Sequence, residues 1–434
     1  MITYEEALRR ILKATPAPSA ARVPLHDAGG LVLAQRIIAP VNLPPFDNSA
    51  VDGYAVRLPS ASRTSPTFER GLSLRVIGRS RAGLPYRRCV HPGQAVRILT
   101  GAVVPRGADR VIMQEHVHRD GARIALKQWS PHLSARQRRA NVSMSAIGPL
   151  GRRQVGGWPD AGRHIRRCGE DLRRGARVLE PGRRLRPQEI ALLASLGCRT
   201  VRVYTPPTVS ILATGDELRR PGERLRPGHI YDSNGVLLHA LSQREGARVV
   251  HRKVIRDVFA SLVAAIRQGL QTGVLLIAGG VSVGEKDLVR AAVKACGVKE
   301  LFWRVNIKPG MPLFVGTYKR TMVFGLPGNP VSVFVTFEEF VKPALARLMG
   351  RSWQDGYTDP ATLVADVTVS KTRRTHFLRV RCSTHNQLVA EPLNGQASHQ
   401  LHSLVEADGW IRMLSTKGLC PAGTQVLVKR EPAS

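Results

Sequence analysis

The chain has 434 residues, 43% of them hydrophobic, which is enough for about three or four domains with substantial cores. It contains no apolar run near the roughly 20 residues of a membrane helix and no signal-peptide core, so we expect a cytoplasmic protein without a membrane span. The net charge of +33 comes mostly from arginine. Because no nucleic-acid-binding motif accompanies it, we expect no specific nucleic-acid partner.

The first part of the chain predicts a mixed domain followed by a β-rich one. Residues 1–45 begin with an amphipathic helical pattern, and we expect them to form a discontinuous domain together with residues 163–190. Short strands alternate with turns in residues 46–162, which predicts a small β domain. Within it, residues 130–162 are arginine-rich without periodicity, which indicates a basic insertion. The expected strands of the small β domain are residues 72–77, 95–99, 110–113 and 123–126.

The second part predicts an αβ domain followed by another β domain. Residues 191–350 alternate between strands and helices, and residues 351–434 return to short strands that we expect to close into a β-barrel or sandwich. The helices of the αβ domain are expected near residues 233–244, 258–270, 285–296 and 330–348. The strands of the last domain are expected at residues 361–369, 377–380, 388–391, 409–414 and 425–429.

Three glycine-rich turns in the αβ domain each follow a short apolar strand. Apolar runs of this length suit strands buried on both faces of a parallel sheet, and ligands bind at the carboxyl ends of such strands. Glycine allows close approach of the backbone to a phosphate, and helix N-termini favour anions, so the turns predict an anionic, phosphorylated ligand. The strand and turn pairs are residues 209–213 with 214–218, 274–278 with 279–284, and 322–324 with 325–330.

Eight motifs, in this order, resemble the MoeA family of molybdopterin molybdenumtransferases and the E domain of gephyrin. The resemblance implies a central three-layer αβ molybdopterin-binding domain with a small β domain, a mixed N-terminal domain and a C-terminal β-barrel-like domain. The insertion is not covered by it. The motifs are residues 48–56, 97–102, 169–171, 210–218, 230–234, 279–287, 307–310 and 325–332.

The family resemblance also implies an activity and partners. Adenylylated molybdopterin and molybdate would react to give molybdenum cofactor and AMP, with Mg²⁺ assisting. The protein would be a homodimer whose active site is shared between the subunits. Molybdopterin adenylyltransferase and molybdoenzyme maturation proteins would be its partners in the pathway.

Four acidic residues beside the expected strand ends match functional acids of the family. Mg²⁺ prefers oxygen ligands, often one or two carboxylates together with substrate phosphate. We therefore expect all four to be ligands of the cation or of the phosphates, and we assign the metal to Glu217 and Asp287. Structural alternatives remain open. Asp232 and Asp257 could cap helices, Glu217 could lie on a solvated turn, and Asp287 could interact with a helix dipole. The four are Glu217, Asp232, Asp257 and Asp287.

The glycine-rich turns supply the expected phosphate-binding residues. The second turn should offer backbone N–H groups and a hydroxyl to a phosphate, although a tight strand-to-helix turn is the alternative. The first turn should play a similar part, and a proline of the third should shape the loop. These candidates are Gly279, Gly280, Ser282 and Gly284, then Thr214 and Gly215, and finally Pro327.

Two basic residues are the expected oxyanion ligands. Arg304 and Lys308 are four apart on a predicted strand, a spacing that places both on one face. The family usually has lysine where Arg304 stands, and often at Met311. Arginine keeps the charge but presents a planar fork, whereas methionine removes a charge.

Two residues of the small β domain complete the set. Asp52 and Thr100 match family positions that reach the partner subunit's site, although an aspartate before Gly53 also suits a β-turn.

Three other functions compete with molybdenum insertion. The first is adenylyl transfer onto molybdopterin, which would use the same glycine turn and consume ATP. The second is a non-catalytic scaffold like the gephyrin E domain, against which the retained acids and Lys308 argue. The third is nucleic-acid binding through the basic charge, which should be weak and sensitive to salt.

Overall fold

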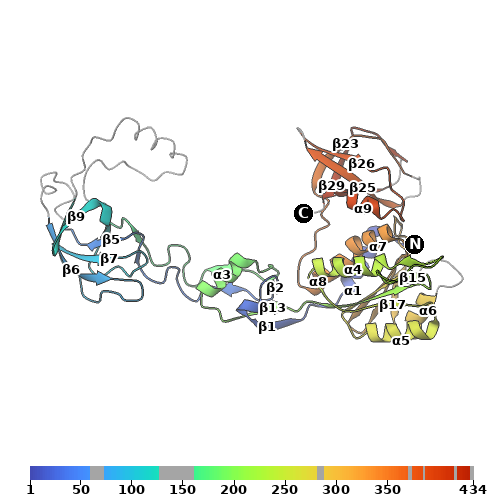
Figure 1. The fold of residues 1–434 in the computed structure, drawn as a ribbon, viewed down its shortest axis with the longest axis horizontal. Helices are drawn as coiled ribbons and strands as arrows, with labels where there is room; N and C mark the ends of the chain where they lie inside the picture. The colour runs from blue at the N-terminus through green and yellow to red at the C-terminus, as the bar shows by residue number, and fades with distance from the viewer. Residues whose placement is uncertain are drawn as a thin grey trace. The chain divides into compact units, whose positions relative to one another are not determined.

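The computed structural model describes residues 1–58, 73–126, 161–280, 288–369, 374–384, 387–414 and 418–430. The chain divides into two compact units (Figure 1). Unit 1 comprises Met1–Arg36, Glu180–Ala194 and Cys198–Ser434, and unit 2 comprises Ile37–Leu179 with Ser195–Gly197. Apart from its last two residues, the expected basic insertion at 130–162 lies outside the described residues. None of the helices in the described ranges combines the length and apolarity needed to cross a membrane.

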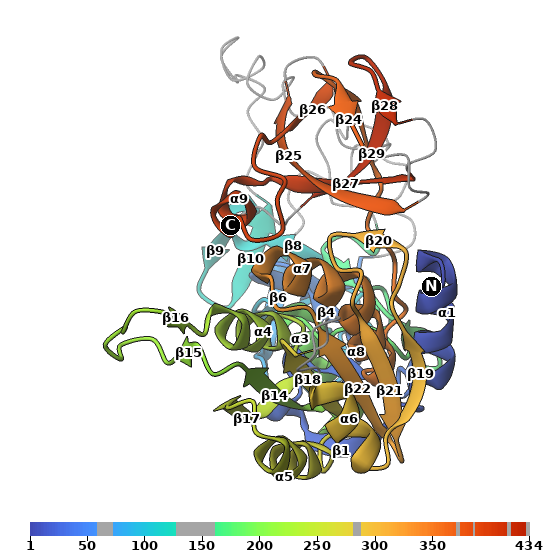
Figure 2. The same cartoon turned by 90° about the vertical axis from the view of Figure 1, so that its right-hand side faces the viewer.

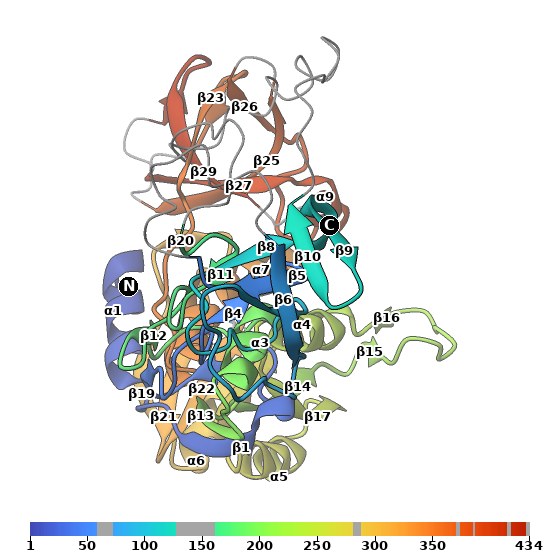
Figure 3. The ribbon, with the colours of Figure 1, turned by 90° about the vertical axis from the view of Figure 1, so that its left-hand side faces the viewer.

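Unit 2 is built on a six-stranded sheet in the order β8-β5-β7-β6-β10-β9, whose outer hairpin of β9 and β10 is drawn in cyan in Figure 3. Alternate side chains pack on opposite faces: Tyr54 and Ile112 belong to one cluster, Ala55 and Val111 to another. The four strands expected here are confirmed, and their ends lie within three residues of the expected ones. The elements are β3 (Ile37–Ile38), β4 (Asn48–Ser49), β5 (Gly53–Val56), β6 (Ser73–Ser80), β7 (Gln94–Ile98), β8 (Arg110–Met113), η4 (Gln114–His116), β9 (Val117–Asp120), β10 (Arg123–Leu126), β11 (Ile165–Arg166) and β12 (Arg177–Leu179).

The N-terminal part of unit 1 is a helix and a small antiparallel sheet. Helix α1 (Tyr4–Ala14) starts where the Thr3 hydroxyl accepts the Glu6 N–H at 3.2 Å, and it buries Tyr4, Ala7 and Ile11, which share one face. The sheet has the order β1-β13-β2. Its elements are β1 (Ala20–Pro24), η1 (Leu25–Asp27), β2 (Val32–Leu33), α3 (Pro187–Ser195) and β13 (Thr200–Tyr204).

The αβ region of unit 1 holds a six-stranded sheet in the order β17-β14-β18-β22-β21-β19. The first four strands are parallel, and the last two run antiparallel to their neighbours. Strands β18 and β22 are buried throughout, as near-continuous apolar runs predict. The strands are β14 (Thr208–Thr214), β15 (Leu218–Arg219), β16 (Ile230–Tyr231), β17 (Arg248–Ile255), β18 (Val274–Ala278), β19 (Lys299–Trp303), β20 (Ile307–Lys308), β21 (Phe314–Tyr318) and β22 (Thr321–Leu326).

Helices cover both faces of this sheet, which confirms the expected three layers. Figure 2 shows α5 and α6 on one face and α4 and α7 on the other, and each face has its own apolar cluster. The helix expected at 330–348 is interrupted by a π-helical turn, η5, just before Pro343, which has no N–H to continue the α-helical ladder. The helices are α4 (Ser233–Arg244), α5 (Phe259–Gly269), α6 (Leu288–Ala295), α7 (Pro330–Thr336), η5 (Phe337–Val341) and α8 (Lys342–Leu348).

The C-terminal part of unit 1 closes into a barrel, which decides between the two expected architectures. Its strands follow the order β25-β26-β23-β29-β27, and β27 pairs back onto β25, from Gly409 with Val380 to Leu414 with Thr375. Strand β20 of the αβ region joins β25 in parallel. The elements are β23 (Asp359–Leu363), β24 (Val367–Thr368), β25 (Thr375–Thr384), β26 (Leu388–Pro392), α9 (His402–Glu406), β27 (Gly409–Leu414), β28 (Leu419–Cys420) and β29 (Gln425–Arg430).

A buried charge network connects η5 with α1 and the barrel. Glu338 and Glu339 are only 3% and 2% exposed. The ammonium of Lys429, on β29, lies 3.2 Å from a Glu338 oxygen and 3.0 Å from a Glu339 oxygen. The Tyr4 and Tyr357 hydroxyls donate to Glu339 at 2.8 and 3.2 Å. Removing Lys429 would therefore leave Glu339 buried without a compensating charge among the described residues.

Candidate functional site

Three turns converge at one edge of the αβ sheet. Strands β14, β18 and β22 are parallel neighbours, and their last paired positions, Ala213, Ala278 and Leu326, lie in register. The turns that follow therefore leave the same carboxyl edge, where open α/β sheets bind ligands. This confirms the strand arrangement on which the phosphate prediction rests.

The second turn is packed so closely that it requires glycine. Gly279 and Gly280 have φ values of +93° and +63°. A Cβ at Gly279 would lie 2.7 Å from the Thr214 carbonyl oxygen, and one at Gly280 would lie 2.5 Å from a Val289 methyl carbon. A side chain at either position would therefore collide with the surrounding protein.

Backbone N–H groups at these turns are only partly available to a ligand. Gly279 donates its N–H to the Leu326 carbonyl at 3.1 Å, and Gly215 donates its own to the Ile255 carbonyl at 3.2 Å. Among the described residues no carbonyl or side chain accepts the Gly280 N–H. The expectation that this turn offers N–H groups thus fails for Gly279 and stays open for Gly280. Ser282 and Gly284 lie outside the described residues, so their roles remain predictions.

The predicted acids have different surroundings. Glu217 is exposed, and its carboxylate makes no hydrogen bond or ion pair with a residue that the structure describes. Asp232 is 3% exposed and caps α4, accepting the Gly235 N–H at 2.6 Å, so the capping alternative holds for it. Asp257 donates its backbone N–H to Asp216 at 3.3 Å. Asp287 lies outside the described residues, so its ligand role remains a prediction.

The prediction that Arg304 and Lys308 share one strand is wrong. Arg304 follows β19 with a φ of +68°, a left-handed conformation that ends the strand, and Lys308 belongs to β20. The strand spacing rule therefore does not apply across this segment. The Arg304 guanidinium instead lies over the Trp303 ring, 4.1 Å from its centroid.

Lys308 has basic neighbours that the sequence did not indicate. Strand pairing places Lys308 opposite His376 on β25. His376 is 2% exposed, and burial lowers its pKa, with further lowering from the charges of Lys308 and Arg374. An oxyanion would reduce this repulsion, so the corner suits a negative ligand.

Two asparagines of the recognised motifs brace the third turn. Asn234, in the first turn of α4, donates from Nδ2 to the Gly328 carbonyl at 2.6 Å. Asn329 donates from Nδ2 to the Ser398 hydroxyl at 2.8 Å. Pro327 is buried beside them, in keeping with a loop-shaping role. Both asparagines could have been found from their motifs, whereas Ser398, in the barrel, carried no sequence signal.

Unit 2 brings together its own two predicted residues. Asp52 accepts hydrogen bonds from the Thr100 N–H and the Thr100 hydroxyl, both at 2.7 Å. These bonds, aided by Arg97, lower the pKa of Asp52 despite a small opposing effect of burial. The carboxylate is thus ionised and fixed in place at the surface of unit 2, while its proposed reach into a partner's site remains a prediction.

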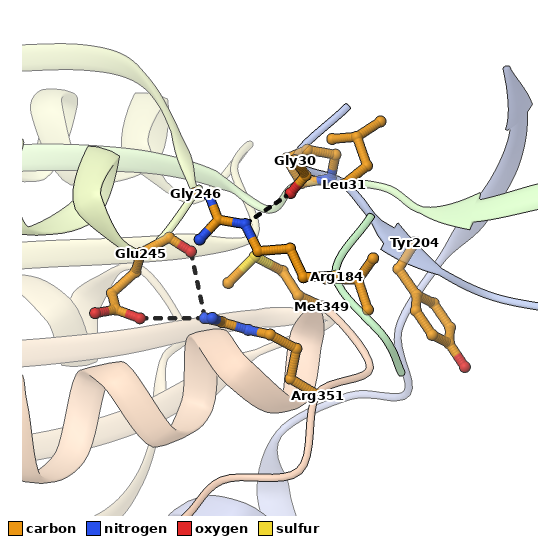
Figure 4. Close-up of a pocket in the computed structure, with 10 residues that line it drawn as sticks. Gly30, Leu31, Arg184, Tyr204, Glu245, Gly246, Met349 and Arg351 are labelled. Atoms are coloured by element: carbon orange, nitrogen blue, oxygen red, sulfur yellow. Dashed lines mark hydrogen bonds and ion pairs between the residues drawn. The ribbon is translucent and has the colours of Figure 1, made fainter. Parts of the chain in front are cut away.

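A hollow elsewhere in unit 1, with about 320 Å³ of empty space that includes open solvent, is not part of this site (Figure 4). None of the three turns lines it. Its charges are satisfied locally: Arg351 donates to the backbone carbonyl and the carboxylate of Glu245 at 3.3 and 3.1 Å, and Arg184 donates to the Gly30 carbonyl at 3.2 Å. The Nε of Arg351 is buried and has no hydrogen-bond partner among the described residues.

Family models cover almost the entire chain. The MoeA N-terminal region (domains I and II) matches residues 2–197, a probable molybdopterin binding domain matches residues 210–347, and the MoeA C-terminal region (domain IV) matches residues 362–430. The three turns and Lys308 all fall within the second model.

Full-length relatives and solved structures agree with these models. The chain is 34% identical to a molybdopterin molybdenumtransferase of Haemophilus influenzae, covering 99% of this chain and 98% of the relative. It is 32% identical to one of Bacillus subtilis, covering 99% and 94%. A crystal structure of the molybdopterin biosynthesis MoeA protein from Pyrococcus horikoshii superposes with a TM-score of 0.78 at 29% identity, covering 99% of both chains.

Proposed function

The chain belongs to the MoeA family of molybdopterin molybdenumtransferases, and on this premise we propose that it transfers molybdenum from molybdate to adenylylated molybdopterin and releases AMP. It is a transferase of molybdenum cofactor biosynthesis, as its full-length relatives are named. The observation that carries the proposal is the edge of the αβ sheet. Three turns suited to phosphate meet there, and the basic segment that contains Arg304 and Lys308 follows a strand ending at the same edge.

The glycine turns would hold the phosphates of the substrate. Gly280 can donate its N–H to a phosphate, because no described residue accepts it. The Thr214 hydroxyl adjoins both glycines, 3.1 Å from the position of a Cβ at either. Asn234 would keep the third turn in position through its bond to Gly328.

Glu217 and Asp287 are the proposed ligands of Mg²⁺, which when bound would neutralise charge on the phosphate oxygens. In the described ranges, no three His, Cys, Asp or Glu side chains are grouped so that they could hold a metal ion. Mg²⁺ often takes only one or two carboxylates from the protein, together with phosphate and water ligands. Glu217 suits this role because its carboxylate is exposed and has no partner among the described residues.

Lys308 and Arg304 would hold molybdate beside the dithiolene of the pterin. Lys308 is exposed, and its charge acts together with that of Arg374 on the neighbouring His376. A tetrahedral dianion would relieve their repulsion and be held by charge-assisted hydrogen bonds. Met311, where the family often has lysine, contributes no charge to this group.

We further propose a homodimer in which Asp52 and Thr100 of one subunit complete the site of the other. Their hydrogen bonds give the Asp52 carboxylate a fixed orientation, as a group acting across an interface requires. Molybdopterin adenylyltransferase would supply the substrate, and molybdoenzyme maturation proteins would receive the product. Both steps would take place in the cytoplasm.

Steady-state kinetics with each substrate varied in turn tests the two halves of the site. Lys308→Ala should raise the KM for molybdate about tenfold and leave that for adenylylated molybdopterin within about twofold. Glu217→Gln should instead raise the Mg²⁺ concentration needed for half-maximal AMP release. Lys299→Ala, which changes an exposed lysine at the other end of β19, is the matched control. Wild-type kinetics in both site variants would contradict the assignment.

A further inference from the structure

Two arginines contact the ring of Trp303 at the end of β19. The guanidinium carbon of Arg290, on α6, is 4.2 Å from the centroid of its ring, and that of Arg304 is 4.1 Å away. Cations within about 6 Å of an indole face are attracted by its quadrupole. The Trp303 ring therefore attracts two positively charged side chains.

The two arginines differ in how their charges are compensated. Arg290 donates from Nε and Nη2 to Glu300, both at 3.1 Å. Arg304 has no hydrogen-bond acceptor or carboxylate partner within the described ranges, and its Nε is buried. A buried donor without a partner costs free energy, so the Arg304 guanidinium is a donor group that lacks its acceptor.

The stack lies at the sheet edge that carries the glycine turns. Trp303 pairs with Phe314 on β21, and Phe314 pairs with Gly325, the first residue of the third turn. At the usual strand spacing, the Trp303 backbone is about 10 Å from that turn. Arg290 lies in the first turn of α6, the next described element after the second glycine turn. The arginines thus flank the edge where the proposed oxyanion site lies.

We infer that Trp303 is a positioning residue that fixes the Arg304 guanidinium as an oxyanion-binding fork, an inference that rests on the proposed function. A free arginine side chain loses rotamer entropy when it is held in one conformation. Stacking on the indole restricts the guanidinium before the anion arrives, and a restricted planar fork can make a bidentate contact at a lower entropic cost. Trp303 thereby adapts the site to arginine where the family usually has lysine.

A double-mutant cycle on the full-length protein tests this coupling, with the KM for molybdate as the readout. Trp303→Leu should raise that KM about tenfold and change kcat less than about twofold, whereas Trp303→Phe, which keeps a ring, should raise it only about twofold. Trp303→Leu should add nothing further in an Arg304→Ala background, because the ring then has no guanidinium to position. Additive effects in the double variant, or an equal fall of kcat in all variants, would overturn the inference.

A control for the loss of a cation–π pair in general is Tyr318→Leu. Lys319 lies over the Tyr318 ring at 5.5 Å, at the opposite end of β21 from Phe314, so this variant should leave the KM for molybdate unchanged. Titration with molybdate alone, with no pterin present, should change the tryptophan emission of the parent protein. Trp303→Phe should lose that change, and its persistence would contradict the inference.

The parent enzyme separates this inference from the proposed function. Molybdate-dependent AMP release by the parent together with normal kinetics in Trp303→Leu would refute the role of Trp303 alone. A parent enzyme whose AMP release ignores molybdate would refute the proposed function and, with it, the inference.

Discussion

Replacing Lys429 by methionine should destabilise unit 1 strongly. Its ammonium lies 3.0 and 3.2 Å from the carboxylates of Glu339 and Glu338. At an effective dielectric constant of about 20, each contact corresponds to roughly 5 kcal/mol of Coulomb attraction, much of it offset by desolvation. Breaking a buried pair by removing one partner costs about 3–5 kcal/mol, a large part of the roughly 5–15 kcal/mol that stabilises a typical domain.

Most of the loss should come through Glu339. Burial opposes ionisation of Glu338, but Lys429, Lys342 and Arg244 together outweigh it and lower the pKa of Glu338, and two of these cations remain in the variant. Among the described residues, Glu339 would keep only the hydroxyl donors of Tyr4 and Tyr357. Combining Lys429→Met with Glu339→Gln should therefore recover part of the stability.

Native-state hydrogen exchange of the β27 and β29 amides is the assay, because it measures local opening without requiring two-state unfolding of the entire chain. A loss of 3 kcal/mol corresponds to exchange about 150-fold faster. Lys299→Met, which replaces an exposed lysine, should change exchange less than about threefold. A Lys429→Met protein whose barrel exchanges like the parent would refute the network as a source of stability.

Three further predictions concern other parts of the chain. Gly280→Ala should reduce AMP release at least about tenfold, because its φ of +63° and the Val289 methyl carbon 2.5 Å from the new Cβ both oppose it; normal activity would show that the turn tolerates a side chain. Asp52→Ala should cost no more than about 1 kcal/mol in urea unfolding yet reduce AMP release about tenfold, since Thr100 loses its acceptor; unchanged activity would argue against a role for this corner in catalysis. The pKa of Glu189 is lowered to about 2 by hydrogen bonds from Arg186 and Arg183, so the stability it contributes should be full above pH 4.5 and be lost as the pH falls toward 2. Glu189→Gln should weaken the loss of unfolding free energy between pH 4.5 and pH 2, and an unchanged loss would contradict this role of Glu189.

Local patterns predicted the αβ core well because they encode its periodicity. The helix expected at 233–244 coincides with α4, and the apolar runs before the glycine turns became buried parallel strands. The third turn adjoins Pro330, which opens α7 as its first helical residue. Each of these features depends on residues a few positions apart, so a single sequence contains the information.

Features that depend on distant pairing or on backbone detail were not predictable. The contact between Lys429 and Glu339 joins residues 90 positions apart. The strand ends at Arg304 because the backbone there is left-handed, and no glycine in the sequence indicates this. The spacing rule therefore placed Arg304 and Lys308 wrongly on one strand. The Gly279 N–H donates to the Leu326 carbonyl because of the register between two strands. The sequence of the turn does not contain that information.

The most direct test of the central claim is AMP release from adenylylated molybdopterin by the purified full-length protein with Mg²⁺, in the presence and absence of molybdate. The account predicts release that requires molybdate and does not consume ATP. Release that ignores molybdate, or no release from a folded protein, would contradict it. Consumption of ATP without molybdate-driven AMP release would indicate adenylyl transfer instead.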